Sequence, residues 1–214
     1  MISRHGYTIV FSTFIVFILF LIFFISFPGL FTGALAVLLG FISIFNLYFF
    51  RDPDRIIPKG DNLILSPADG TVIRIEEVEE PDYFKAKVQR LSIFLSVFNV
   101  HVNRIPISGK VDFLRYKTGT FVAAFEHKAS EENEQSIIGI SANGRKILFT
   151  QIAGVIARRI IYNLELGEEV TAGVRFGLIR YGSRVDIYFP PDVKLRVNLK
   201  DKVIGGETII GEFI

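Results

Sequence analysis

Two long uncharged segments open the chain. Residues 9–27 are nineteen residues without a charged side chain, and residues 30–50 are twenty-one more, with a Pro-Gly pair between the runs. At about 1.5 Å per residue, a helix of either length matches the roughly 30 Å hydrocarbon core of a bilayer. The pattern predicts a helical hairpin over residues 1–50 with two membrane spans. A single span followed by an interfacial helix is the alternative, whereas a cleaved signal peptide usually has a shorter apolar part.

Basic residues flank this hairpin at its two ends and not at its turn. Arg4 precedes the first run. Arg51, Arg55 and Lys59 follow the second run, and the Pro-Gly connection carries no charge. The positive-inside rule then puts both ends in the cytoplasm. We therefore expect the chain in the cell membrane, with the remaining residues on the cytoplasmic side.

From residue 51 onward the chain changes to short segments separated by glycine. Residues 71–75 and 111–115 alternate apolar and polar side chains, and residues 91–97 and 146–150 are short and apolar enough for buried strands. About ten such strands predict one β-rich barrel or sandwich over residues 51–214. The best helix candidate is the segment 152–164.

Two further segments bear on the fold. The charged run 126–134 predicts a solvated loop. The last turn, residues 202–211, has Gly-Gly-Glu between apolar stretches and resembles the closing hairpin of lipoyl-type domains. The expected fold is therefore mainly β, a barrel-sandwich hybrid of the lipoyl/biotinyl type, preceded by the membrane hairpin.

Composition excludes several classes of site. The net charge of +2 and the absence of a basic stripe interleaved with aromatic residues argue against nucleic acid as a partner. The chain has no cysteine and only three histidines, so disulfides and thiolate metal sites are ruled out and no metal site is predicted.

The bond between Gly182 and Ser183 is the best candidate for covalent chemistry. Val185, Ile187 and Phe189 alternate with polar residues, which predicts a strand that Ser183 opens directly after a glycine turn. Glycine tolerates the unusual backbone needed for a serine hydroxyl to attack the preceding carbonyl. The resulting ester can eliminate to dehydroalanine, whose hydrolysis leaves a pyruvoyl group.

Four segments in order carry a family resemblance: Phe49-Phe-Arg-Asp-Pro-Asp54, Ser66-Pro-Ala-Asp-Gly70, Phe98-Asn-Val-His-Val-Asn-Arg-Ile-Pro106 and Phe176-Gly-Leu-Ile-Arg-Tyr-Gly-Ser-Arg-Val-Asp186. Together they resemble the short form of phosphatidylserine decarboxylase, and the match covers nearly all of residues 46–214. The resemblance implies self-cleavage between Gly182 and Ser183, with residue 183 converted to the pyruvoyl cofactor. Fragments 1–182 and 183–214 then stay together as a heterodimer, and homo-oligomerisation is left open.

The implied reaction is decarboxylation of phosphatidylserine to phosphatidylethanolamine and carbon dioxide, through a Schiff base between the pyruvoyl group and the serine amine. A serine hydroxyl needs a neighbouring base to act as a nucleophile. His101 is the candidate, because His5 precedes the first span and His127 lies in the charged run. Asp69 is expected to orient His101 and stabilise its cation.

One departure from the family affects the role of His101. Longer members often carry a second histidine three residues later, where this chain has Arg104. His101 is therefore a candidate for self-cleavage, for decarboxylation, or for both.

The phospholipid substrate and the membrane are the expected partners. Phe49 and Phe50 are expected to meet the acyl chains, and Arg51, Arg55 or Arg180 the phosphate. Two other hypotheses stay open from the residues. One is a pyruvoyl decarboxylase of another amino compound, and the other is a membrane-anchored lipoyl-like binding module without catalysis.

Overall fold

The computed structural model describes residues 1–120, 122–126, 129–155 and 159–214. It divides into two compact units, Met1–Asp54 and Arg55–Ile214. The prediction of a mainly β domain that follows two apolar helices is confirmed.

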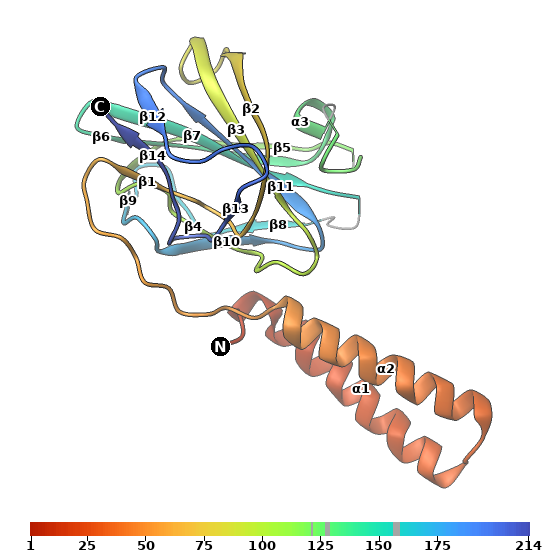
Figure 1. The fold of residues 1–214 in the computed structure, drawn as a ribbon. Coiled ribbons are helices and arrows are strands. Elements are labelled where there is room, and N and C mark those ends of the chain that lie inside the picture. The colour runs from red at the N-terminus through yellow and green to blue at the C-terminus, as the bar shows by residue number, and fades with distance from the viewer. Residues whose placement is uncertain (121, 127–128, 156–158) are drawn as a thin grey trace. The chain divides into compact units, whose positions relative to one another are not determined.

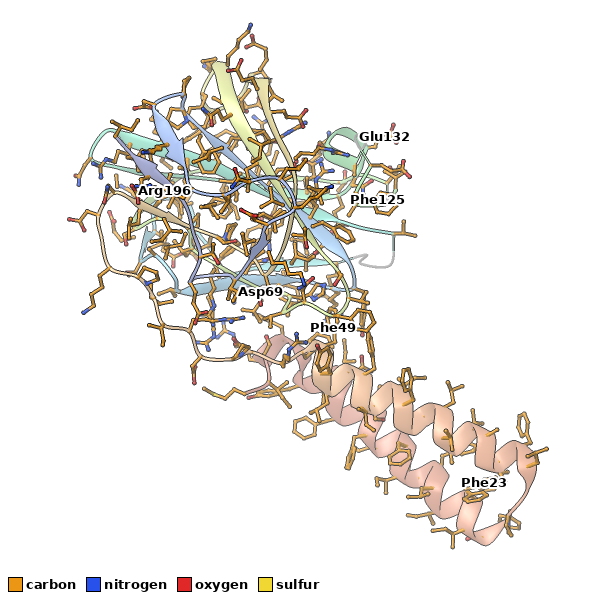
Figure 2. All side chains as sticks on the ribbon, in the orientation of Figure 1. Phe23, Phe49, Asp69, Phe125, Glu132 and Arg196 are labelled. Carbon is orange, nitrogen blue, oxygen red and sulfur yellow. The ribbon has the colours of Figure 1, made fainter. Side chains whose placement is uncertain are left out.

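The first unit is an antiparallel pair of helices. A short 3₁₀ turn, η1 (Arg4–Gly6), leads into α1 (Tyr7–Ser26), and α2 (Leu30–Phe49) returns alongside it (Figure 1). Both helices are long and apolar enough to cross a membrane, and most of their side chains are exposed. Figure 2 shows these side chains, Phe23 among them, projecting outward along the pair. An apolar exterior of this kind suits lipid rather than water.

Small residues let the two helices approach closely. A side chain at Gly33 would meet the ring of Phe24 at 3.2 Å, and one at Gly40 would meet the ring of Phe17 at 3.1 Å. The Ser43 hydroxyl donates a 3.0 Å hydrogen bond to the Thr13 carbonyl. Glycine and serine at such positions are the usual means of packing helices in lipid, where no hydrophobic force favours their association.

The second unit is built around one curled eight-stranded antiparallel sheet (Figure 1). Its strand order is β13-β2-β3-β11-β7-β6-β5-β9. The bounds are β13 (Lys202–Val203), β2 (Gly70–Glu80), β3 (Ala86–Leu95), β11 (Ser183–Phe189), β7 (Arg145–Ala153), β6 (Gln135–Ala142), β5 (Gly109–Lys117) and β9 (Glu169–Val170).

Two three-stranded sheets close the core. One has the order β1-β14-β12, with β1 (Leu63–Leu65), β14 (Ile209–Phe213) and β12 (Val193–Leu195), and the other has the order β4-β10-β8, with β4 (Val102–Arg104), β10 (Arg175–Ile179) and β8 (Ile160–Tyr162). Apolar side chains from all three sheets form one buried cluster. Burial of this common core is what holds the three sheets together.

Three local predictions are wrong. The segment 152–164 is not a helix where the structure describes it, because β7 runs to Ala153 and β8 occupies Ile160–Tyr162. Ile152, Ala153 and Ile160 are buried in strands, and periodicity alone does not separate such short buried strands from a short helix. The segment 202–211 is not a hairpin, because β13 pairs with β2 whereas β14 pairs with β1 and β12.

The charged run 126–134 is also more than a solvated loop. A short helix, α3 (Ala129–Glu132), lies within it, and Ala129 and Asn133 are fully buried. The Asn133 amide donates to the carbonyls of Val122 and Ala153, each at 2.7 Å. His127 lies outside the described residues.

A buried ion pair fixes this segment to the outer face of β11. Arg184 Nε lies 2.8 Å from Asp186 Oδ1, and neither side chain is exposed. The Arg184 guanidinium also donates to the carbonyls of Ala124 at 2.9 Å and Glu126 at 2.8 Å, and it contacts the Ser130 hydroxyl. One arginine therefore satisfies backbone groups that the loop would otherwise leave unpaired.

We predict that Arg184→Met destabilises the protein, because Asp186 would remain buried without its cation. The expected loss is about 3–5 kcal/mol of unfolding free energy. The double variant Arg184→Met/Asp186→Leu should recover part of it, since no uncompensated charge is left. Urea unfolding of the full chain in detergent, followed by circular dichroism in a Ser183→Ala background, measures both. A single variant as stable as its parent would refute the role of the pair.

Candidate active site

The Gly182–Ser183 bond lies in a left-handed turn at the start of β11. Tyr181 has φ 51° and Gly182 has φ 73°, so two consecutive residues occupy the left-handed region. Glycine adopts it freely, whereas a tyrosine there is strained by roughly 1–2 kcal/mol. The predicted glycine turn before a strand is confirmed.

Ser183 is buried and its hydroxyl is unsatisfied. The residue has no exposed surface, and its Oγ has no hydrogen-bond partner within the part of the chain that the structure describes. Val185 and Ile187, on the same side of β11, belong to the core cluster, so Ser183 faces the interior of the fold. A buried hydroxyl left unpaired costs about 1–3 kcal/mol, and such exceptions call for a functional explanation.

His101 lies beside this bond in a defined tautomer. Its Nδ1 is 3.0 Å from the Asn99 carbonyl, and its Nε2 is 3.3 Å from the backbone nitrogen of Gly182. A carbonyl only accepts, so Nδ1 carries the proton, and a backbone N–H only donates, so Nε2 presents its lone pair. The fully buried imidazole therefore offers a basic nitrogen next to the residue that precedes Ser183.

Asp69 is held as a carboxylate by an ion pair. Arg55 Nη2 lies 2.8 Å from Oδ2 and 3.0 Å from Oδ1, and the Gly205 N–H donates to Oδ1 at 2.8 Å. Arg55 Nη1 also lies 3.7 Å from Glu207. The Asn99 carbonyl holds His101 Nδ1, and the expected action of Asp69 on His101 stays a prediction.

The segment around Asp69 is tied to the strand that follows His101. The Arg104 N–H donates to the Pro67 carbonyl at 2.9 Å, and the Asn103 amide reaches the same carbonyl at 3.5 Å. The Arg104 guanidinium donates to the Gly173 carbonyl at 3.0 Å. At the position where longer family members carry a histidine, this chain therefore has a side chain that braces the backbone.

Sequence reasoning missed a buried polar chain near the site. The Ser136 hydroxyl donates to Gln151 Oε1 at 2.6 Å, and Gln151 Nε2 donates to Asn103 Oδ1 at 2.7 Å. All three side chains are fully buried. The available signal was Gln151, a polar residue at a core-facing position between Phe149 and Ala153 of β7.

The residues proposed for lipid contact fall into two groups. Phe49 and Phe50 are fully buried, and Phe50 fills the space beside Gly6. Arg51 lies over the ring of Tyr48, 3.8 Å from its centroid. These residues belong to the unit Met1–Asp54, and their contacts with acyl chains or phosphate stay predictions.

Arg180 lies next to the strained turn. Its backbone N–H donates to the Arg159 carbonyl at 3.2 Å. Burial, followed by the charge of Arg159, lowers the pKa of Arg180 from its usual value. Arg55, by contrast, is already neutralised by two carboxylates. Binding of a phosphate by Arg55 or Arg180 stays a prediction.

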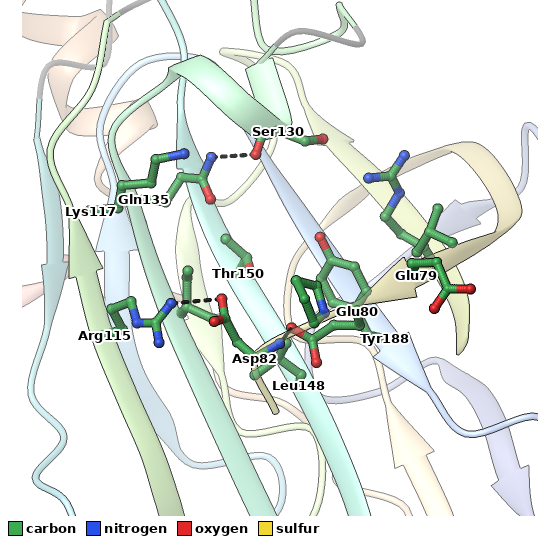
Figure 3. Close-up of a pocket in the computed structure, with 14 residues that line it drawn as sticks. Glu79, Glu80, Asp82, Arg115, Lys117, Ser130, Gln135, Leu148, Thr150 and Tyr188 are labelled. Atoms are coloured by element: carbon green, nitrogen blue, oxygen red, sulfur yellow. Dashed lines mark hydrogen bonds and ion pairs between the residues drawn. The ribbon is translucent and has the colours of Figure 1, made fainter. Parts of the chain in front are cut away.

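A separate polar cavity of about 540 Å³ lies on the opposite face of the curled sheet. Arg115 pairs there with Asp82 at 2.6 Å, and Gln135 donates to the Ser130 carbonyl at 2.7 Å (Figure 3). Tyr188 lines this cavity from β11, and burial raises its pKa. Since Tyr188 and Ser183 point to opposite faces of β11, the cavity is not part of the Ser183 site.

Comparison with known proteins agrees with the resemblance found in the sequence. A family model described as phosphatidylserine decarboxylase matches residues 42–211. The chain belongs to the phosphatidylserine decarboxylase family. A phosphatidylserine decarboxylase proenzyme of Wolbachia pipientis wMel is 48% identical over 214 residues, covering 98% of this chain and 90% of the relative.

Two further phosphatidylserine decarboxylase proenzymes are similarly close. The protein from Desulfotalea psychrophila (strain LSv54 / DSM 12343) is 49% identical over 171 residues, which is 79% of this chain and 80% of the relative. The protein from Rickettsia africae (strain ESF-5) is 51% identical over 171 residues, or 78% and 74% of the two chains. The family is one of carboxy-lyases, so the expectation of an enzyme is confirmed.

We predict that His101→Gln slows cleavage at Gly182–Ser183 by about 100-fold or more, because Nε2 would no longer supply a basic lone pair. His5→Gln, in the other unit, is the matched control and should leave cleavage unchanged. A time course of fragment formation on denaturing gels measures both variants. Equal rates for His101→Gln and the parent chain would remove His101 from this step.

Proposed function

We propose that this chain cleaves itself between Gly182 and Ser183, converts Ser183 to a pyruvoyl group, and decarboxylates phosphatidylserine to phosphatidylethanolamine and carbon dioxide. The observation that carries the proposal is the buried, unpartnered Ser183 hydroxyl directly after Gly182, whose φ is left-handed and whose N–H donates to His101 Nε2. The relatives named above are phosphatidylserine decarboxylase proenzymes, which supports both the reaction and the processing step.

Self-cleavage begins with an acyl shift from nitrogen to oxygen. The Ser183 Oγ attacks the Gly182 carbonyl carbon, His101 Nε2 takes the hydroxyl proton, and the C–N bond breaks as that proton passes to the Ser183 nitrogen. The product is an ester between Gly182 and the Ser183 side chain. Loss of the α-proton of Ser183 then expels the Gly182 carboxylate and leaves dehydroalanine. Hydrolysis of dehydroalanine releases ammonia and leaves the pyruvoyl group.

The residues around Ser183 fit a pyruvoyl group. Its precursor hydroxyl is free of competing hydrogen bonds, and the Nε2 of buried His101 accepts the N–H of the preceding residue, Gly182. The pyruvoyl group supplies a carbonyl that condenses with the substrate amine and accepts the electron pair left by carbon dioxide. No metal is needed for this role, and no group of three or more metal-ligating side chains occurs among the described residues.

The rest of the reaction requires a proton on the carbon that lost carbon dioxide. His101 is fully buried and is held by Asn99 at Nδ1, with Nε2 at the N–H of Gly182. We assign to Nε2 the delivery of that proton. Asp69, with its Arg55 pair, is proposed to stabilise the protonated imidazole, because a carboxylate in a water-poor site favours a nearby cation.

The two apolar helices are consistent with a lipid substrate. They are long and apolar enough to anchor the chain, and the ends of the hairpin are joined where Ser3 N–H bonds the Phe50 carbonyl. We propose insertion in the cell membrane with the β domain on the cytoplasmic side. Arg180 is proposed to bind the substrate phosphate, with Arg51 and Arg55 as weaker candidates and Phe49 and Phe50 near the acyl chains.

A soluble amino acid as substrate is the less favoured alternative, because it needs no apolar anchor. The non-catalytic lipoyl-like module is disfavoured by the carboxy-lyase family match. The two fragments should remain a heterodimer, because β11, which opens the second fragment, is paired with β3 and β7 of the first.

Mass spectrometry of the purified, active protein tests the proposal. We expect fragments 1–182 and 183–214, the second with a carbonyl at its start that reacts with hydrazides. Ser183→Ala should give one uncut chain and no carbon dioxide from phosphatidylserine in mixed micelles. The matched control Ser92→Ala removes another buried hydroxyl, on the opposite face of the sheet, and should cleave normally.

Two results would contradict the proposed function. Activity in the Ser183→Ala chain would remove the pyruvoyl assignment. A wild-type chain that is cleaved and carbonyl-terminated but releases carbon dioxide only from a soluble amino acid would favour the alternative substrate.

A further inference from the structure

Gly154 lies against the carbonyl group of the bond expected to break. It directly follows β7, and a Cβ added there would lie 2.3 Å from the Gly182 carbonyl oxygen and 3.2 Å from its carbon. Real Cβ atoms essentially never approach another atom below 3.0 Å. Its φ lies outside the left-handed region, so contact with Gly182, rather than backbone conformation, excludes a side chain.

We propose that Gly154 is a positioning residue for self-cleavage, holding the scissile carbonyl where Ser183 can attack it. The inference rests on the proposed function. The alignment of Gly154 with Gly182 follows from the β11–β7 ladder, in which Ser183 is the partner of Ala153. Since the atoms in contact at Gly182 are backbone atoms, neither side yields by a change of rotamer.

The contact of Gly154 involves the Gly182 carbonyl oxygen, the atom on which negative charge develops during self-cleavage. When Ser183 Oγ adds to the Gly182 carbon, the carbonyl oxygen becomes negatively charged and the carbon becomes tetrahedral. The N–H of Gly182 is held at the same time by His101 Nε2 at 3.3 Å. His101 therefore contacts the peptide group that precedes Gly182, and Gly154 contacts the scissile peptide group that follows it. A methyl group at position 154 would rotate the carbonyl away from the approach of Oγ.

A purely structural role for Gly154 predicts a different outcome, and Gly177 provides the matched control. A Cβ at Gly177 of β10 would lie 2.3 Å from the Ile161 carbonyl oxygen and 3.2 Å from Gln151 Nε2, also without a left-handed φ. Gly154→Ala and Gly177→Ala thus introduce the same clash with a backbone carbonyl. Only the first involves the carbonyl of Gly182.

The experiment compares these two variants with the wild-type full chain in detergent. Freshly made protein is treated with hydroxylamine, which splits the Gly182–Ser183 ester into a hydroxamate and a free serine hydroxyl. The masses of the fragments are then measured by mass spectrometry. We expect Gly154→Ala to slow formation of both ester and mature fragments by about 100-fold, the scale of a roughly 1 Å misplacement. Gly177→Ala should cleave within a few-fold of wild type.

Stability is measured on the same substitutions in a Ser183→Ala background, where no cleavage occurs. We expect both glycine variants to fold there, with similar losses in melting temperature. Cleavage of Gly154→Ala at the wild-type rate would overturn the positioning role. So would failure of the Gly154→Ala/Ser183→Ala chain to fold, or equal slowing by Gly177→Ala, since either outcome identifies a packing defect.

The two proposals fail in different ways. If the wild-type chain forms neither ester nor fragments, the proposed function is overturned, and the role of Gly154 with it. If the wild-type chain is cleaved and Gly154→Ala is cleaved equally fast, only the role of Gly154 is overturned.

Discussion

The pairing of β11 with β3 on one side and β7 on the other is the constraint on which the rest of the domain depends. Ser183 lies opposite Leu95 and Ala153, and the pairing continues along the strand to Tyr188 on both sides. One face of β11 contributes to the core, and the other carries the buried Arg184–Asp186 pair that holds the segment 122–134. The proposed break before Ser183 would remove none of these interactions.

The interior of the site combines satisfied polar groups with one unsatisfied hydroxyl. Ser136, Gln151 and Asn103 bond to one another, and His101 is bonded at both ring nitrogens. A buried network with all partners in place is rigid, and its members do not compete for Ser183. These groups bond to one another or to the backbone rather than to Ser183, so the free energy of leaving its hydroxyl unpaired is offset by burial of the core.

Features governed by local periodicity could be predicted from the sequence. The helical hairpin and the strand after Gly182 were found because their apolar spacing is long or strictly alternating. The helix predicted for segment 152–164 was wrong because apolar residues of this spacing are compatible with a short buried strand as well as with a helix. The hairpin predicted for segment 202–211 was wrong because β13 and β14 belong to different sheets. Their pairing partners lie far away in the sequence.

The features of the site also differ in whether the sequence alone could predict them. Ser183 and His101 were identifiable as residue types in a family pattern. The contact of His101 Nε2 with Gly182, the pairing of Asp69 with Arg55, and the approach of Gly154 to Gly182 depend on residues separated in sequence. No pattern along one chain encodes such distances, since they follow from how the sheets pack.

The left-handed pair Tyr181 and Gly182 has a consequence for the direction of the reaction. While the chain is continuous, β10 and β11 force Tyr181 into a conformation that an unconstrained tyrosine avoids. If the bond after Gly182 is cut as proposed, these two residues become a carboxyl end that is no longer joined to β11. In the proposed reaction the Ser183 nitrogen leaves as ammonia, so the second fragment has no amine left to condense with the Gly182 carboxylate, and the proposed maturation runs in one direction only.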